Sequence, residues 1–260
     1  MYSALKDKLR KGVYSKRFVK DLIFLDSVDS TNNYGLSLRK KKEGTVILTK
    51  KQISGKGRDG RLWHSVKDKS IAVSIIIDYP KKSDSIPFVP LLSANAIMET
   101  LDFFDLHSKV KWPNDVLVNS KKISGVLCES SFIKNHSNFI VVGIGINVNL
   151  DSEDFIKDEI NYGIEPTSLK IETSKNFYLE DVALTLLNNF SKWILEYKKN
   201  NYHNILEFWK NNWFDADKEI VVVKYGKLIN GIAKDISPHG ELILQTKDGL
   251  ELINSGELKT

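Results

Sequence analysis

Cysteine is nearly absent from this 260-residue chain, which has only Cys128. A single cysteine cannot form an internal disulfide, so the chain is not a small secreted domain held together by disulfide bonds. Cys128 lies in the apolar run 126–128, a setting typical of a buried core thiol. The five histidines show no metal-ligand spacing, and no Ser/His/Asp or Cys/His arrangement has a recognisable context. The sequence therefore indicates neither a zinc site nor a nucleophilic side chain.

Long hydrophobic runs are also missing. No apolar stretch approaches the ~20 residues that a helix needs to cross a bilayer. Residues 1–20 are basic and lack the apolar core of a signal peptide, so we expect them to form a short polar helix or tail. Together these features predict a cytoplasmic protein with no membrane span.

The remaining composition is that of a globular protein. Hydrophobic residues make up 42% of the chain and charged residues 27%, with 15 glycines and 6 prolines. The length suits one ordinary domain plus a small one. The net charge of +5 fits nucleotides, acidic proteins or nucleic acid as partners, and it fits a solvated lysine-rich surface equally well.

Apolar periodicity predicts strands and helices in the first four fifths of the chain and only strands in the last fifth. In the first part we expect strands at 21–25, 45–50, 71–79, 109–112, 115–119, 122–130 and 139–143, and helices at 90–106, 179–197 and 202–213. We also expect a helix-compatible stretch at 31–40 and a loop-like region at 151–175 with room for a short helix. After Trp213, short strands at 219–224, 228–235, 241–246 and 250–253 predict a small β-barrel. The predicted boundary near 215–218 divides the chain into a main domain, 21–215, and a small domain, 216–260.

A basic glycine-rich loop occupies residues 52–65. Its run Gly55-Lys56-Gly57-Arg58-Asp59-Gly60 satisfies G-x-G-x-x-G, but a dinucleotide-binding turn requires a helix to begin in the loop, and a strand follows here. Glycines allow a ligand to approach the backbone closely, and arginine and lysine hold phosphate oxygens. Trp63 follows the loop and could stack on a base. A mobile surface loop with solvated charges explains the same residues.

Two further segments combine polar residues with strand ends. The string Lys111-Trp112-Pro113-Asn114-Asp115 is either a plain turn or a binding loop, and Lys122 and Gly125 lie in the strand that follows. A glycine within a strand, such as Gly125, often marks a close backbone approach. The segment 143–149 places two glycines and two asparagines in an apolar strand, as at a bulge or a strand end.

Five motifs follow one another in the order and spacing of one protein family. They are Ser30-Thr31-Asn32; Gln52 with Gly55-Lys56-Gly57-Arg58-Asp59-Gly60-Arg61-Leu62-Trp63; Lys111-Trp112-Pro113-Asn114-Asp115; Lys122-Ile123-Ser124-Gly125; and Gly143-Ile144-Gly145-Ile146-Asn147. In this order they resemble the motifs of biotin protein ligases over roughly residues 21–150. The small C-terminal β domain also fits that family.

The resemblance implies an α+β fold. The expected main domain is a class II synthetase-like catalytic domain with a mixed β-sheet backed by helices, and the expected C-terminal domain is an SH3-like β-barrel. Two positions depart from the family pattern. Lys56 stands where the family usually has arginine, which keeps the charge but loses the bidentate fork, and Asp59 occupies a variable position that is often bulky or basic.

The resemblance also implies roles for individual residues. Biotin would be bound by Ser30, Thr31, Asn32, Gln52, Gly55, Lys56, Gly57, Lys122 and Gly125. ATP would be bound by Arg58, Arg61, Trp63, Lys111, Asn114 and Asn147, and catalysis would fall to Lys122, Arg58 and Asp115. Asp115 would orient the attacking amine or accept its proton. Mg²⁺ is expected with ATP, held mainly by the phosphates rather than by protein ligands.

The implied activity joins biotin to a lysine of a biotin carboxyl carrier protein or domain at the expense of ATP. About 20 residues precede the first predicted strand, too few for the three-helix DNA-binding unit of repressor members, so no DNA binding is expected. A homodimer is left open. The alternatives are a lipoate ligase or lipoyl/octanoyl transferase, a nucleic-acid-binding module, and a pseudo-enzyme that only binds biotin.

Overall fold

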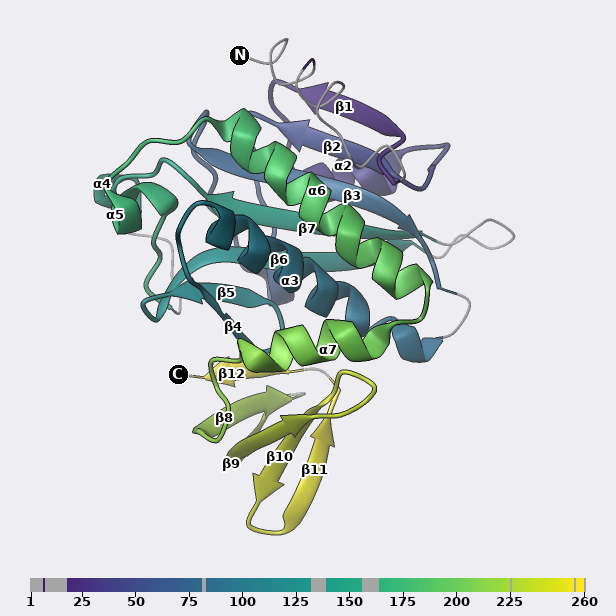
Figure 1. Ribbon diagram of the computed structural model, residues 1–260, viewed down its shortest axis with the longest axis vertical. Coiled ribbons are helices and arrows are strands. Elements are labelled where there is room, and N and C mark those ends of the chain that lie inside the picture. Colours follow the sequence, from purple (N-terminus) through teal and green to yellow (C-terminus); the bar gives the residue numbers. More distant parts are fainter. Residues whose placement is uncertain are drawn as a thin grey trace.

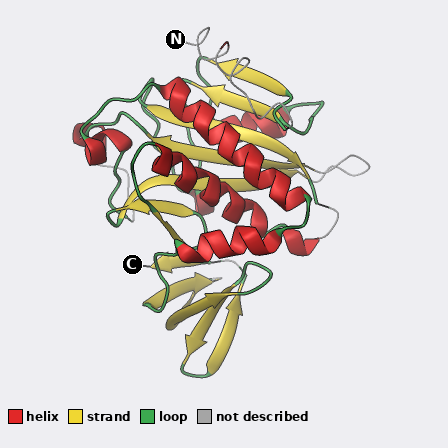
Figure 2. Cartoon of the chain, in the orientation of Figure 1, coloured by secondary structure: helices red, strands yellow, loops and turns green. Residues whose placement is uncertain are grey.

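The computed structural model describes residues 18–80, 83–131, 139–155, 164–224, 226–254 and 256–259, together with Asp7. The predicted N-terminal helix or tail therefore lies largely outside the described residues. Helices cover a large sheet, and a second, smaller sheet follows at the C-terminal end of the chain (Figures 1 and 2). Of the helices described, none is long and apolar enough to cross a membrane.

The large sheet has seven strands and is mixed. Strands β1 and β2 pair in parallel, and the other neighbours pair antiparallel. The order across the sheet is β1 (Asp21–Leu25), β2 (Thr45–Thr49), β3 (Ser70–Asp78), β7 (Phe139–Asn147), β6 (Lys121–Ser131), β5 (Asp115–Val118) and β4 (Lys109–Lys111). This arrangement confirms the predicted mixed sheet.

The two faces of this sheet carry different layers. One face is covered by α3 (Phe88–Phe103) and α6 (Leu179–Lys198), with α7 (Tyr202–Asn211) packed against α3 (Figure 1). The opposite face carries α2 (Thr31–Ser37), and the short helices α4 (Ser152–Phe155) and α5 (Leu169–Thr173) lie at one side.

Alternation along the strands explains this asymmetry. In β3, Val73 and Ile75 join the core under α3 and α6, while Ala72 and Ser74 point to the opposite face. In β7, Ile144 and the residues two positions away on either side also join the core under α3 and α6. Burial of aliphatic side chains stabilises by about 1.5–3 kcal/mol each, so the helix-covered face contains most of the stabilising core. On the other face α2 packs over a smaller core cluster, and the site forms beside it.

The small sheet is antiparallel throughout. Its five strands run in the order β11 (Gly249–Ile253), β10 (Leu242–Thr246), β9 (Lys227–Ile236), β8 (Glu219–Lys224) and β12 (Glu257–Lys259). The change from mixed to purely antiparallel structure after Trp213 agrees with the predicted second unit. Strand β12 was not predicted, because three residues are too short to show a period.

The bounds predicted for four elements are wrong by two or more residues. The helix-compatible stretch 31–40 is helical only over Thr31–Ser37. The helix predicted at 90–106 begins at Phe88, since Pro90 is tolerated within a first helical turn, and it ends at Phe103. The strand predicted at 139–143 continues without a break to Asn147, although two glycines lie inside it. The helix predicted at 202–213 ends at Asn211, because the chain then pairs with β4.

Candidate active site

Small residues on three neighbouring strands hollow out the face of the sheet opposite α3 and α6. Ser74 pairs with Gly143 and Ala72 with Gly145 across β3 and β7, and Gly125 of β6 pairs with Gly145. Side chains this small leave room above the sheet. The result is a cavity of about 270 Å³, near the lower limit of roughly 300–1,000 Å³ for small-molecule sites.

Two of these glycines are required by close side-chain contacts. A Cβ atom at Gly143 would lie 2.4 Å from Asn32 Oδ1, and one at Gly145 would lie 2.2 Å from Trp63 Cε2. Neither distance is sterically allowed. Of the two sequence interpretations of this segment, the bulge is wrong, because β7 keeps its register with β3 through both glycines, and the strand end lies at Asn147.

A buried hydrogen-bond network of uncharged groups forms one end of the cavity. Gln52 Oε1 accepts from the Thr31 backbone N–H at 2.9 Å and from the Thr31 hydroxyl at 3.1 Å. The Ser74 hydroxyl lies 2.7 Å from Thr31 Oγ1 and 2.6 Å from Asn32 Oδ1. With the buried Ser30 beside them, these residues form what we call the neutral end: Ser30, Thr31, Asn32, Gln52 and Ser74.

Asn32 fixes the neutral end to the sheet. Its Nδ2 donates to the Leu127 carbonyl at 3.2 Å and to the Glu129 carboxylate at 2.8 Å. Buried polar groups with satisfied hydrogen bonds hold their orientation, so this end is preorganised for a neutral polar ligand group.

The glycine-rich loop folds back on itself as a hairpin beside the cavity. Trp63 N donates to the Gly55 carbonyl at 2.8 Å, and Gly57 N donates to the Arg61 carbonyl at 2.8 Å. The turn of this hairpin is Arg58–Gly60, where φ is 53° at Asp59 and 77° at Gly60. Both residues are thus in the left-handed region, which aspartate adopts more readily than most residues other than glycine. The strand after the loop confirms that no dinucleotide-binding helix begins here.

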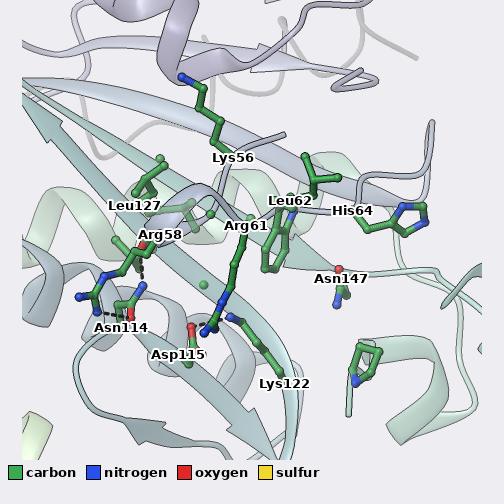
Figure 3. Close-up of a pocket in the computed structure, with 18 of the residues that line it drawn as sticks. Lys56, Arg58, Arg61, Leu62, His64, Asn114, Asp115, Lys122, Leu127 and Asn147 are labelled. Carbon is green, nitrogen blue, oxygen red and sulfur yellow. Dashed lines mark hydrogen bonds and ion pairs between the residues drawn. The ribbon is translucent and has the colours of Figure 1, made fainter. Parts of the chain in front are cut away.

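Cationic side chains from this loop and from β4 and β6 form the other end. The Lys122 ammonium pairs with the Asp115 carboxylate at 2.7 Å, and Arg61 points toward both (Figure 3). Arg58 donates to Asn114 Oδ1 at 3.3 Å and to the Gly256 carbonyl at 3.1 Å. We call Arg58, Arg61, Lys111 and Lys122 the cationic end.

Lys111 is the most buried member of the cationic end, with 4% of its surface exposed. Burial lowers the pKa of its ammonium, against the opposing effect of Asp215 and Asp115. Lys56, by contrast, extends away from these cations and donates to Asn33 Oδ1 at 2.7 Å (Figure 3).

The fold brings the predicted site residues together, with one exception. All of them line the cavity except Gly55, which lies behind the loop, where a Cβ atom would meet the Trp63 carbonyl oxygen at 2.4 Å. Asn147 lines the cavity but already donates from Nδ2 to the Thr167 carbonyl at 2.9 Å. Trp63 lies over Gly145 and Gly125 with its indole N–H buried and without a hydrogen-bond partner among the described residues.

Several lining residues were not predicted. Ser74 supports the cavity from beneath through its bonds to Thr31 and Asn32 and was also missed, although the small residues Ala72 and Ser74 alternating in an apolar strand are a signal that could have found it. Apolar walls come from residues far apart in sequence: Phe155, Ile164, Pro166 and Leu258. His64 is partly buried and also lines the cavity.

Comparisons with known proteins agree with this architecture. Residues 24–147 match the Biotin/lipoate A/B protein ligase family, and residues 218–258 match the Biotin protein ligase C terminal domain. The Bifunctional ligase/repressor BirA of Bacillus spizizenii is 28% identical over 98% of this chain and 78% of its own length. The Biotin--[acetyl-CoA-carboxylase] ligase of Paracoccus denitrificans is 26% identical over 90% of this chain and 98% of its own.

A solved structure shows the same fold. The biotin protein ligase from Aquifex aeolicus in complex with biotin and ATP superimposes with a TM-score of 0.77 and 29% identity, covering 92% of this chain and 97% of that one. The large sheet with its hollowed face and the first family match define the class, the biotin and lipoate protein ligases. The second match and the named relatives then place this chain within it: it belongs to the biotin protein ligase family.

Proposed function

We propose that this enzyme activates biotin with ATP and transfers it to a lysine of a biotin carboxyl carrier protein or domain. The observation that carries this proposal is the polarity of one cavity, which has a neutral hydrogen-bonding end and a cationic end. Biotin has the matching polarity, with an uncharged ureido ring at one end and a carboxylate at the other. A lipoate ligase would need no such hydrogen-bonding group for the ring of its acid, which favours biotin over lipoate.

The first step needs electrostatics rather than a general base. The biotin carboxylate is already ionised at pH 7, and its oxygen attacks the α-phosphorus of ATP, so that a C–O–P anhydride forms and pyrophosphate leaves. We assign Lys122 to the carboxylate and α-phosphate oxygens, because its ammonium is fixed by Asp115 at 2.7 Å. We assign Arg58, Arg61 and Lys111 to the nucleotide oxygens, where they stabilise the charge that develops.

The second step transfers the acyl group. The carrier's lysine attacks the carbonyl carbon of the anhydride, an amide forms, and AMP leaves with the electron pair of the broken C–O bond. The amine must be neutral to attack, and the nearby cations Lys122 and Arg58 would lower its pKa. Asp115 lies beside Lys122, and its carboxylate would orient this amine or accept its proton.

Mg²⁺ is expected to bind together with ATP. We propose that the phosphate oxygens supply most of its ligands, since the Asp115 carboxylate is already held by Lys122. When bound, the ion neutralises part of the phosphate charge.

The C-terminal unit contributes to the same site. Leu258 lines the cavity, and the Gly256 carbonyl accepts from Arg58. These contacts support a role for residues 216–260 in nucleotide or carrier engagement.

The direct test is incubation of the chain with labelled biotin, ATP and a biotin carrier domain, with lipoate as the control acid. We expect ATP-dependent labelling of one carrier lysine. Labelling with lipoate at the same rate, or none with biotin, would reject the assignment.

A further inference from the structure

Asp215 is a buried carboxylate at the predicted domain boundary near 215–218. Its surface is 3% exposed, and burial raises its pKa. A carboxylate this buried is unusual unless it has partners. Its Oδ2 atom accepts a hydrogen bond from the backbone N–H of Trp112 at 3.2 Å.

The chain before Asp215 is aligned on β4 by backbone hydrogen bonds. Val110 N donates to the Asn212 carbonyl at 2.9 Å, and Phe214 N donates to the Val110 carbonyl at 2.8 Å, so that Trp213 pairs with Val110 in parallel. This short strand places Asp215 opposite Trp112, at the start of the 112–115 turn. The turn is therefore held from outside the cavity by a residue that does not line it.

Residues of the same turn contact the side chains of the cationic end. It begins after Lys111, which lines both the cavity and a second hollow at the domain boundary that Asp215 also lines. It ends with Asn114, which accepts from Arg58, and Asp115, which pairs with Lys122. A displacement of the turn would thus move the partners of two cations, Arg58 and Lys122, together.

We propose that Asp215 is a positioning residue for the reaction, which anchors the 112–115 turn through Trp112 N and so holds the cationic end in register with the nucleotide. This proposal rests on the proposed function for its kinetic consequence. It predicts that loss of Asp215 impairs the use of ATP while the neutral end, on α2 and β3, still binds biotin.

The test compares three variants of the full chain. Asp215→Ala removes the acceptor and leaves a buried N–H unpaired, so we expect kcat/KM for ATP in biotin-dependent ATP–pyrophosphate exchange to fall roughly tenfold to a hundredfold. Asp215→Asn keeps an acceptor oxygen and should lie within about threefold of the unmodified chain. Asp217→Ala, two residues on and paired on the surface with Lys234, is the matched control and should be unchanged.

A binding measurement separates positioning from general destabilisation. The biotin dissociation constant from calorimetry should change by less than about twofold in all three variants, because the neutral end does not contact Asp215. Equal losses for biotin and ATP, unchanged kinetics in Asp215→Ala, or an asparagine variant as impaired as the alanine variant would overturn the proposal.

Hydrogen–deuterium exchange tests whether Asp215 holds the 112–115 turn, and it does so without measuring catalysis. A negative result for this anchor can therefore be told apart from a negative result for the proposed function. A peptide spanning residues 109–118 should exchange faster in Asp215→Ala than in Asp217→Ala, while residues 70–78 stay equally protected. Equal exchange of the 109–118 peptide in both variants would contradict the anchor even if the chain proved to have a different activity.

Discussion

The two ends of the cavity are built on opposite physical principles. At the neutral end, Thr31 and Gln52 are buried and bonded to each other before any ligand arrives. At the cationic end, the Lys122 and Asp115 side chains keep 23% and 19% of their surface exposed, and Arg58 bonds to neighbouring oxygens that a phosphate could replace. The hydrogen bonds of the neutral end are therefore formed before any ligand binds, whereas we expect the cationic end to complete its contacts only with an anion.

The largest expected effect comes from removing a cation. We predict that Lys122→Ala lowers biotin-dependent ATP–pyrophosphate exchange by roughly a hundredfold to a thousandfold, since the loss of one preorganised donor at a charge-developing site has that size. Biotin should still bind, because the neutral end is intact. Lys121→Ala is the matched control, since Lys121 is the adjacent residue and its ammonium pairs with Glu165 on the surface. Exchange within a few-fold of normal in Lys122→Ala would remove Lys122 from the mechanism.

A smaller effect is expected at the neutral end. Gln52→Ala should weaken biotin binding by roughly fivefold to 150-fold, or about 1–3 kcal/mol, because it leaves the Thr31 N–H and the ligand amide unpaired. Ser30→Ala should act in the same direction, and ATP binding should change little in either. Calorimetric titration measures both ligands. Ser37→Ala, at the far end of α2, is the control, and unchanged biotin affinity in both pocket variants would place the acyl pocket elsewhere.

The glycine-rich loop, residues 52–65, runs from the neutral end to the cationic end, and it can be compared with and without ligand. Contacts from biotin and then from the adenylate should order it, because bound oxygens become partners for Lys56, Arg58 and Arg61. Biotin plus ATP should therefore slow trypsin cleavage after these residues by about threefold or more. Cleavage after the exposed Lys247 should not change, and lipoate plus ATP should not protect. Equal cleavage with and without ligand would show that the loop does not close over the site.

The smallest effect is expected at Cys128, on the face of β6 that is turned away from the cavity. Cys128 is partly buried, and burial raises the pKa of its thiol to about 12, so much less of it is thiolate at pH 8 than in an unfolded chain. Alkylation of the folded protein should be correspondingly slow and should accelerate as the pH rises toward 12. Cys128→Ser should keep the ligase rate within about twofold, and a large loss of activity would contradict a core role.

Much of the architecture could be predicted from periodicity and motif order. The strands β1, β2 and β8 and the helix α6 lie close to the predicted residues, because apolar alternation and helical spacing are local properties. The motif residues could be named for the same reason, since each lies within a short run. The sequence could not show that Lys56 leaves the other loop cations for Asn33, because that choice depends on a contact between distant segments.

What the sequence determined by itself is the set of local preferences: where strands alternate, where glycine permits a close approach, and which charges occur together. Only the tertiary structure decided which of these meet. Register across β3, β7 and β6 placed Ser74, Gly143 and Gly125 on one face, and a short pairing beside β4 brought Asp215 to Trp112 N. Register and burial arise from packing between segments far apart in the chain, so no local pattern contains them.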